Sequence, residues 1–82
     1  MSTEAENAAP LSSLQPGERG RILSLDGLGS HKGRVMEMGL TIGSTVEVVR
    51  FAPLGDPMEL KVRGANISLR KAEAAGVRVE RA

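Results

Sequence analysis

The sequence contains no cysteine, tryptophan or tyrosine, and among its 82 residues it has one phenylalanine, Phe51, and one histidine, His31. Without cysteine, disulfide bonds and thiolate metal ligands are excluded, which agrees with a reducing compartment such as the cytoplasm. The sequence has eleven basic and ten acidic residues, for a formal net charge of +1, and residues of the two charges are interspersed along the chain. A nucleic-acid binder usually carries a basic stripe and stacking aromatic residues. We therefore expect no nucleic-acid partner.

Long hydrophobic runs are also missing. No stretch approaches the roughly 20 apolar residues of a transmembrane helix, so we expect contact with a membrane only through a partner. The first ten residues, Met1 to Pro10, are polar and acidic and lack the basic and apolar regions of a signal peptide. We predict a disordered tail over residues 1–10 and a single cytoplasmic domain over residues 11–82.

The side chains needed for catalysis or metal binding do not converge in any recognisable motif. A nucleophilic site would have to combine His31 with a serine and an acid, and we interpret His31 as an exposed residue that starts a helix. Met36 and Met38 carry thioether donors, but side chains two apart on a helix do not face each other. We predict a protein that is not an enzyme, with no cofactor and no metal site.

Periodicity and turn residues predict short strands and short helices. The densest run of β-branched residues, Thr45-Val-Glu-Val-Val-Arg-Phe51, predicts a strand. Further strands are expected over 20–25, 58–63, 66–70 and 77–80, with a turn at 63–66 that makes the middle two an antiparallel hairpin. Helices are expected over 31–38, with Ser30 as N-cap and Gly39 as the left-handed terminator, and over 70–75. Residues 27–33 match no phosphate-binding pattern and are interpreted as a flexible loop.

Five short strands with frequent glycines favour closure into a barrel, which removes exposed strand edges. The fold class predicted from the sequence is therefore all-β with minor helix, in the form of a small SH3-like antiparallel β-barrel. Weak self-association is expected only if a strand edge is left open.

The loop Pro53-Leu-Gly-Asp-Pro57 is the first candidate for partner binding. Its two prolines fix their own φ angles, and a stiff loop loses less entropy when it binds. Two roles are open for Leu54. It either folds back to plug the open end of the barrel or contacts a partner.

The helix around Met36 is the second candidate. Val35, Met38 and Leu40 are expected to cover the core, which leaves Met36 for an outside contact, since methionine adapts well to partner surfaces. The candidate partner-binding residues are Met36, Leu40, Pro53, Leu54, Gly55, Asp56 and Pro57.

Several segments in order resemble the FeoA family, over Leu11 to about Val79. They are Leu14-x-x-Gly17, Gly20-Arg-Ile22, Arg34-Val-Met-Glu-Met-Gly-Leu40, Gly43, Val46-Glu-Val48, Ala52-Pro-Leu-Gly-Asp-Pro57, Ile67-Ser-Leu-Arg-Lys-x-Glu-Ala74, Val77 and Val79. Val35 and Ile42 depart from the leucine and proline that members often carry at these positions.

The resemblance implies an SH3-like β-barrel in the cytoplasm that acts with FeoB, a membrane protein with a GTP-hydrolysing domain and an iron-conducting one. It implies regulation of nucleotide hydrolysis, assembly of the complex, or both, and it supplies no catalytic residues. The alternative is a stand-alone SH3-like domain related to the C-terminal domain of iron-dependent transcriptional repressors. Such repressors place DNA-binding and dimerisation domains before the barrel, and we expect neither to the N-terminal side of Leu11.

Overall fold

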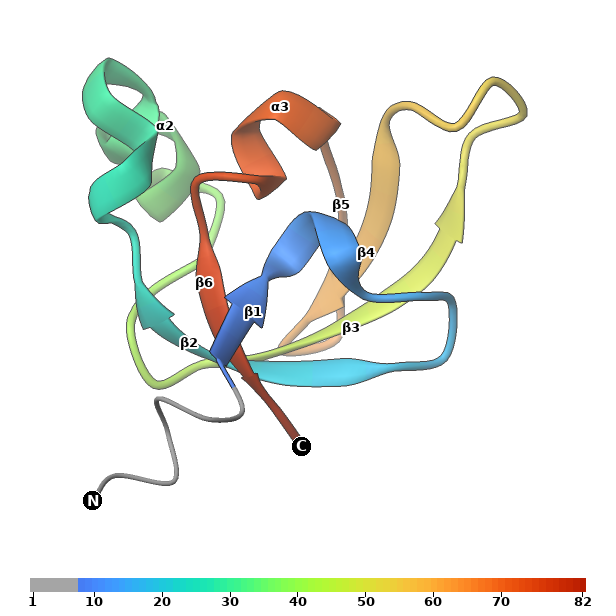
Figure 1. Ribbon diagram of the computed structural model, residues 1–82, viewed down its shortest axis with the longest axis horizontal. Coiled ribbons are helices and arrows are strands. Elements are labelled where there is room, and N and C mark those ends of the chain that lie inside the picture. Colours follow the sequence, from blue (N-terminus) through green and yellow to red (C-terminus); the bar gives the residue numbers. More distant parts are fainter. Residues whose placement is uncertain (1–7) are drawn as a thin grey trace.

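The computed structural model describes residues 8–82 (Figure 1). The elements in chain order are β1 (Ala8–Pro10), the 3-10 turn η1 (Leu11–Ser13), β2 (Arg19–Ser24), the 3-10 segment η2 (Asp26–His31), α2 (Lys32–Glu37), β3 (Thr45–Phe51), β4 (Met58–Val62), β5 (Ala65–Leu69), α3 (Lys71–Ala74) and β6 (Arg78–Arg81). Most of the predicted tail, residues 1–7, lies outside the described residues. The last three residues of the predicted tail, Ala8–Pro10, form β1, so ordered structure begins before Leu11.

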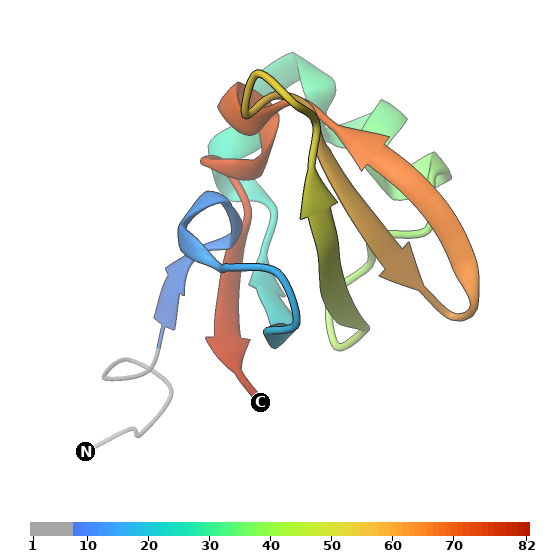
Figure 2. The same cartoon turned by 90° about the vertical axis from the view of Figure 1, so that its right-hand side faces the viewer.

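All described strands belong to one antiparallel sheet in the order β1-β6-β2-β3-β4-β5. Register shifts place one extra residue, Leu23, in β2 and another, Val49, in β3. Such bulges sharpen the twist of a strand, and Figure 2 shows the sheet curving around the interior. The all-β class is confirmed, but the described strands do not close into a barrel, because β1 and β5 are left as edges.

The concave face of the sheet carries the core. Side chains alternate along each strand, so in β4 the buried Met58, Leu60 and Val62 face inward while Glu59 and Lys61 face out. The other buried apolar residues are Leu11, Leu14, Ile22, Leu25, Leu28, Val35, Leu40, Val46, Val48, Leu69, Ala74, Val77 and Val79. Core residues thus come from every part of the described chain, including the short helices.

The β4–β5 hairpin turns on two residues, Arg63 and Gly64, with φ angles of 51° and 82°. Two successive positive φ angles indicate a type I′ turn, whose twist suits a two-residue hairpin. The turn predicted at 63–66 is confirmed in place, but β5 already begins at Ala65.

The segment predicted as a flexible loop, residues 27–33, is instead mostly helical, in η2 and the start of α2. This segment is held in place at its first glycine, where η2 rests on the turn between α3 and β6. A Cβ atom on Gly27 would lie 2.8 Å from the carbonyl oxygen of Gly76, so the two backbones touch directly. The predicted N-cap, Ser30, lies inside η2, and His31 is the N-cap residue of α2 without a side-chain cap bond. Gly39 ends this helix region with the predicted positive φ, 108°.

Helices α2 and α3 and the loop of residues 52–57 lie at the same end of the molecule, which we call the helical end (Figures 1 and 2). The C-terminus lies at the opposite end. Within residues 8–82, no helix has the length and apolar character required to cross a lipid bilayer.

Candidate functional site

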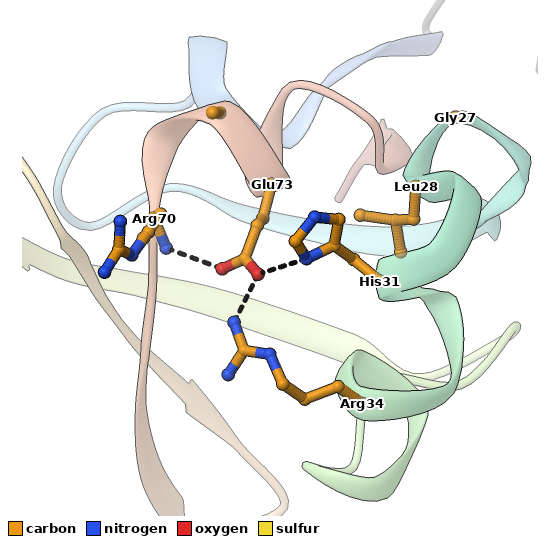
Figure 3. Close-up of a pocket in the computed structure, with 7 residues that line it drawn as sticks. Gly27, Leu28, His31, Arg34, Arg70 and Glu73 are labelled. Atoms are coloured by element: carbon orange, nitrogen blue, oxygen red, sulfur yellow. Dashed lines mark hydrogen bonds and ion pairs between the residues drawn. The ribbon is translucent and has the colours of Figure 1, made fainter.

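A pocket of about 510 Å³ opens at the helical end, between the η2–α2 segment and α3 (Figure 3). Its lining combines an apolar part with basic side chains and one acid, and consists of Gly27, Leu28, His31, Arg34, Arg70, Ala72 and Glu73. The two sides come from segments about forty residues apart in the sequence, and they meet because η2 packs on the chain that follows α3.

Glu73 is the central side chain of this pocket. It is the third residue of α3, and its Oε1 atom accepts a hydrogen bond from the backbone N–H of Arg70 at 3.2 Å, as in half of a capping box. Its Oε2 atom accepts a hydrogen bond from Nη2 of Arg34 and lies 3.2 Å from Nδ1 of His31. Figure 3 shows these groups pointing toward the carboxylate from three directions. Glu73 therefore joins α3 to the η2–α2 segment.

The surroundings of Glu73 keep it ionised. The hydrogen bond from Arg34 holds the pKa of this carboxyl below its ordinary value of 4.5, although burial acts in the opposite direction. The Arg70 backbone N–H and the charges of Arg34 and His31 also lower the pKa. The Glu73 side chain is only 6% exposed, while those of Arg34 and His31 are more than half exposed. The Glu73 carboxylate is thus already bonded within the protein. The exposed groups that the pocket presents to a partner are mainly the basic side chains of Arg34 and His31.

Sequence reasoning placed His31 correctly at the start of a helix but missed its ion pair. The Arg70-x-x-Glu73 spacing carried a weak signal, because an acid at the third helical position often caps the backbone. Arg34 lies 39 residues away from Glu73, and sequence alone gives no sign of that pairing. Within residues 8–82, no three histidine, aspartate or glutamate side chains converge as metal ligands.

The loop of residues 52–57 presents Leu54 to solvent. The Leu54 side chain is 97% exposed, so the interpretation of this residue as a plug of the barrel is wrong. The loop is held by backbone hydrogen bonds from Gly55 N–H to Ala52 at 2.7 Å and from Ala52 N–H to Pro57 at 3.0 Å. The Asp56 carboxylate accepts a hydrogen bond from the backbone N–H of Lys71 at 3.0 Å. Asp56 thus fastens the loop to α3 beneath the exposed Leu54.

The two candidates near α2 have different surroundings. Met36 is 42% exposed and remains available for an outside contact. Leu40 is fully buried in the core, as is Val35. In this conformation Leu40 offers no surface to a partner, because the chain after Gly39 turns it inward.

The remaining candidates share the helical end. In Figure 1, α3 lies between α2, which carries Met36, and the 52–57 loop, which carries Pro53, Leu54, Gly55, Asp56 and Pro57. Arg70 lines both the pocket around Glu73 and a smaller hollow beside Asp56 and Pro57. The two sequence segments proposed separately therefore lie at the same end of the molecule, on either side of α3.

Comparison with known proteins identifies the relatives of this chain. The FeoA domain family matches residues 9–81. The chain is 40% identical over 70 residues to the Fe(2+) transport protein A/Fe(2+) transporter FeoB fusion protein of Porphyromonas gingivalis. That match covers 85% of this chain but only 8% of the fusion protein.

Solved structures agree with this assignment. Iron(II) transport protein A of Clostridium thermocellum superposes with a TM-score of 0.82 at 41% identity, covering 89% of this chain and 45% of that one. The zinc-complexed FeoA of Stenotrophomonas maltophilia, described as an SH3 domain protein, gives 0.74 at 28% identity, covering 85% and 87%. The SH3-like fold predicted from the sequence is confirmed.

Iron-dependent repressors, the alternative relatives considered from the sequence, share the fold of this chain. IdeR of T. acidophilum superposes with a TM-score of 0.75 at 19% identity, covering 92% of this chain and 34% of that one. Identity this low shows a common fold alone. The match over residues 9–81 and the 40% identity to the fusion protein show that the chain belongs to the FeoA family.

Proposed function

We propose that this protein is a non-enzymatic accessory protein of bacterial ferrous iron uptake, which binds a FeoB-type membrane GTPase from the cytoplasmic side. The observation that carries the proposal is the similarity to a protein in which transport protein A and FeoB form one polypeptide. A domain joined covalently to the transporter is held beside it. A domain related to it has the same neighbour available as a binding partner.

The helical end supplies a suitable surface for this contact. Leu54 is almost fully exposed on a loop whose backbone is already hydrogen-bonded, so binding would order few additional groups. Met36 adds a flexible apolar side chain on the other side of α3. Apolar anchors of this kind, surrounded by polar residues, are typical of the central contacts in protein interfaces.

The state of Glu73 supports binding over catalysis. A general base needs an unengaged carboxylate or imidazole within reach of a substrate proton. Here the carboxylate accepts hydrogen bonds from Arg34 and from the Arg70 backbone, and His31 is also directed at it. These groups position two helices against each other.

Substitution of Leu54 by aspartate tests the proposed contact. In a titration of the purified cytoplasmic part of the transporter, we expect saturable binding of the wild type. Leu54→Asp should weaken it at least about tenfold, because an apolar anchor is replaced by a charge that must be desolvated. The melting temperature should hardly change, since Leu54 lies outside the core.

Ile42→Asp is the matched control, because Ile42 is also an exposed apolar residue, at 65%, but lies outside α2, α3 and the 52–57 loop. It should bind like the wild type. Repeating the titration with a GTP analogue separates regulation of the nucleotide cycle, which predicts a change in affinity, from assembly alone. If wild-type protein binds neither the cytoplasmic part nor the full-length transporter, the proposed function is wrong. Binding that Leu54→Asp leaves intact would move the contact to another surface.

A further inference from the structure

Strand β5 exposes backbone hydrogen-bonding groups at the edge of the sheet. In a two-residue hairpin the pair that closes the turn, here Val62 and Ala65, is hydrogen-bonded, and such pairs then alternate along the strands. The residues between them, Asn66 and Ser68, consequently direct both N–H and C=O away from β4. Both residues are exposed, and no strand within residues 8–82 pairs with this side of β5.

The two edges of the sheet differ in how they are protected (Figure 2). The other edge strand, β1, has three residues and ends at Pro10, which has no N–H to offer. Strand β5 has five residues, contains no proline, and pairs with β4 without a bulge. Exposed edges are usually blocked because they attract other strands. An unblocked edge of this length therefore favours strand addition.

The β5 edge is also the basic part of a nearly neutral protein. Between residues 58 and 71 the chain has four basic residues, Lys61, Arg63, Arg70 and Lys71, and one acidic residue, Glu59. Glu59 is already paired with Arg50, at 2.9 Å between Nε and Oε1. Arg63 and Arg70 flank β5 at its two ends. Arg63 donates a hydrogen bond to Ser44 at 3.2 Å and the Arg70 side chain lines the pocket around Glu73, so an added segment would meet positive charge near its two ends.

This charge pattern disfavours a second copy of the same chain as the added strand. If Asn66 is set opposite Ser68 of a second copy in antiparallel pairing, Arg63 in the turn before β5 comes to the same end as Lys71 of that copy, in the helix after β5. Like charges brought together at both ends of such a pair disfavour it.

We propose that β5 receives an extended acidic segment from the cytoplasmic part of the transporter as an additional strand. Asn66 and Ser68 would supply two N–H donors and two C=O acceptors to its backbone, and Arg63 and Arg70 would attract acidic side chains near its ends. A hollow of about 170 Å³ beside β5, lined by Val49, Glu59, Leu60, Asn66, Ile67 and Ser68, offers room for one apolar side chain. The partner in this inference rests on the function proposed above.

Proline at position 68 tests the strand addition. Ser68→Pro removes the outward N–H and places a ring where the added strand must lie, while the bonds to β4 remain because that N–H does not face β4. We expect binding of the transporter's cytoplasmic part to weaken at least about tenfold, from the loss of a backbone bond and the steric block. Ser68→Ala is the matched control, since it changes the side chain but keeps the N–H, and it should bind like the wild type.

Hydrogen exchange in wild-type protein gives a second readout that does not depend on the folding of a variant. The amides of Asn66 and Ser68 should become protected when the transporter fragment is added. If Ser68→Pro melts like the wild type and binds equally well, or if these amides stay unprotected in the complex, the strand addition is wrong while the proposed function stands. Protection that develops on concentrating this protein alone would identify a second copy as the occupant and overturn the acidic segment. Absence of wild-type binding would overturn both.

Discussion

Replacing Gly76 with alanine is expected to lower the free energy of unfolding by about 3 kcal/mol, the upper part of the range for overpacked positions. The added Cβ atom would lie 2.5 Å from the carbonyl oxygen of Gly27 and 2.7 Å from its carbonyl carbon. Both are backbone atoms that cannot rotate away, so η2 would have to move off the α3–β6 turn. The φ angle of Gly76 is outside the left-handed region, and the cost is therefore steric.

Gly33→Ala provides the control for this experiment. Gly33 lies in α2, and a Cβ atom there meets no atom within 4 Å beyond the helix's own backbone. Alanine should stabilise this position by about 0.5–1 kcal/mol, through its higher helix propensity. Urea unfolding of the two variants measures both effects. Wild-type stability in Gly76→Ala would show that the two backbones are not in contact.

The second large effect is expected at Glu73. Glu73→Gln keeps the size of the side chain but removes the charge that engages Arg34 and His31, and it should destabilise the fold by about 2 kcal/mol, as for the loss of a hydrogen bond to a charged group. Glu37→Gln is a suitable control because Glu37 is an exposed acid in α2. A surface change of this kind should stay within about 0.5 kcal/mol of the wild type.

The effect of Glu73 should depend on pH with a defined sign. Because the pKa of Glu73 is lower in the folded protein than its ordinary value of 4.5, the unfolded chain binds its proton first as the solution is acidified. The stabilisation is therefore complete above about pH 5 and is lost as the pH falls through the lowered pKa. Unfolding of wild type and Glu73→Gln should differ most at neutral pH and converge in acid. A constant difference across this range would show that the charge of Glu73 does not stabilise the fold.

The sequence predicts those elements whose signals are local. The run of β-branched residues from Thr45 to Phe51 gives the observed bounds of β3, and the terminator role of Gly39 is visible in its own backbone. The alternation around Leu60 and Ile67 likewise predicts the hairpin. In these cases the pattern that forms the element lies within the element.

Features that depend on residues far apart in the chain cannot be predicted from local sequence patterns. Strand β1 is three residues long and forms only because β6 lies beside it, so Ala8–Pro10 carries no strand pattern of its own. The contact of η2 with Gly76 joins segments far apart in the sequence and has no local signal. The hydrogen bond from the backbone N–H of Lys71 to Asp56 joins the loop to α3, and Leu54 of this loop lies outside the core. The ion pair between Arg34 and Glu73 is invisible for the same reason.

The pairing of β1 with β6 brings the two ends of the described chain together. Ala8 lies opposite Glu80, so the first and last described strands emerge together, away from the helical end (Figure 1). A polypeptide continuing from either side would start at the end of the molecule opposite α2, α3 and the 52–57 loop. In a covalent fusion, a tether of this kind sets the effective concentration of the domain beside the transporter, and a weak contact is then sufficient. A domain supplied as an independent polypeptide has no such tether, so its occupancy of the transporter would follow its abundance in the cell.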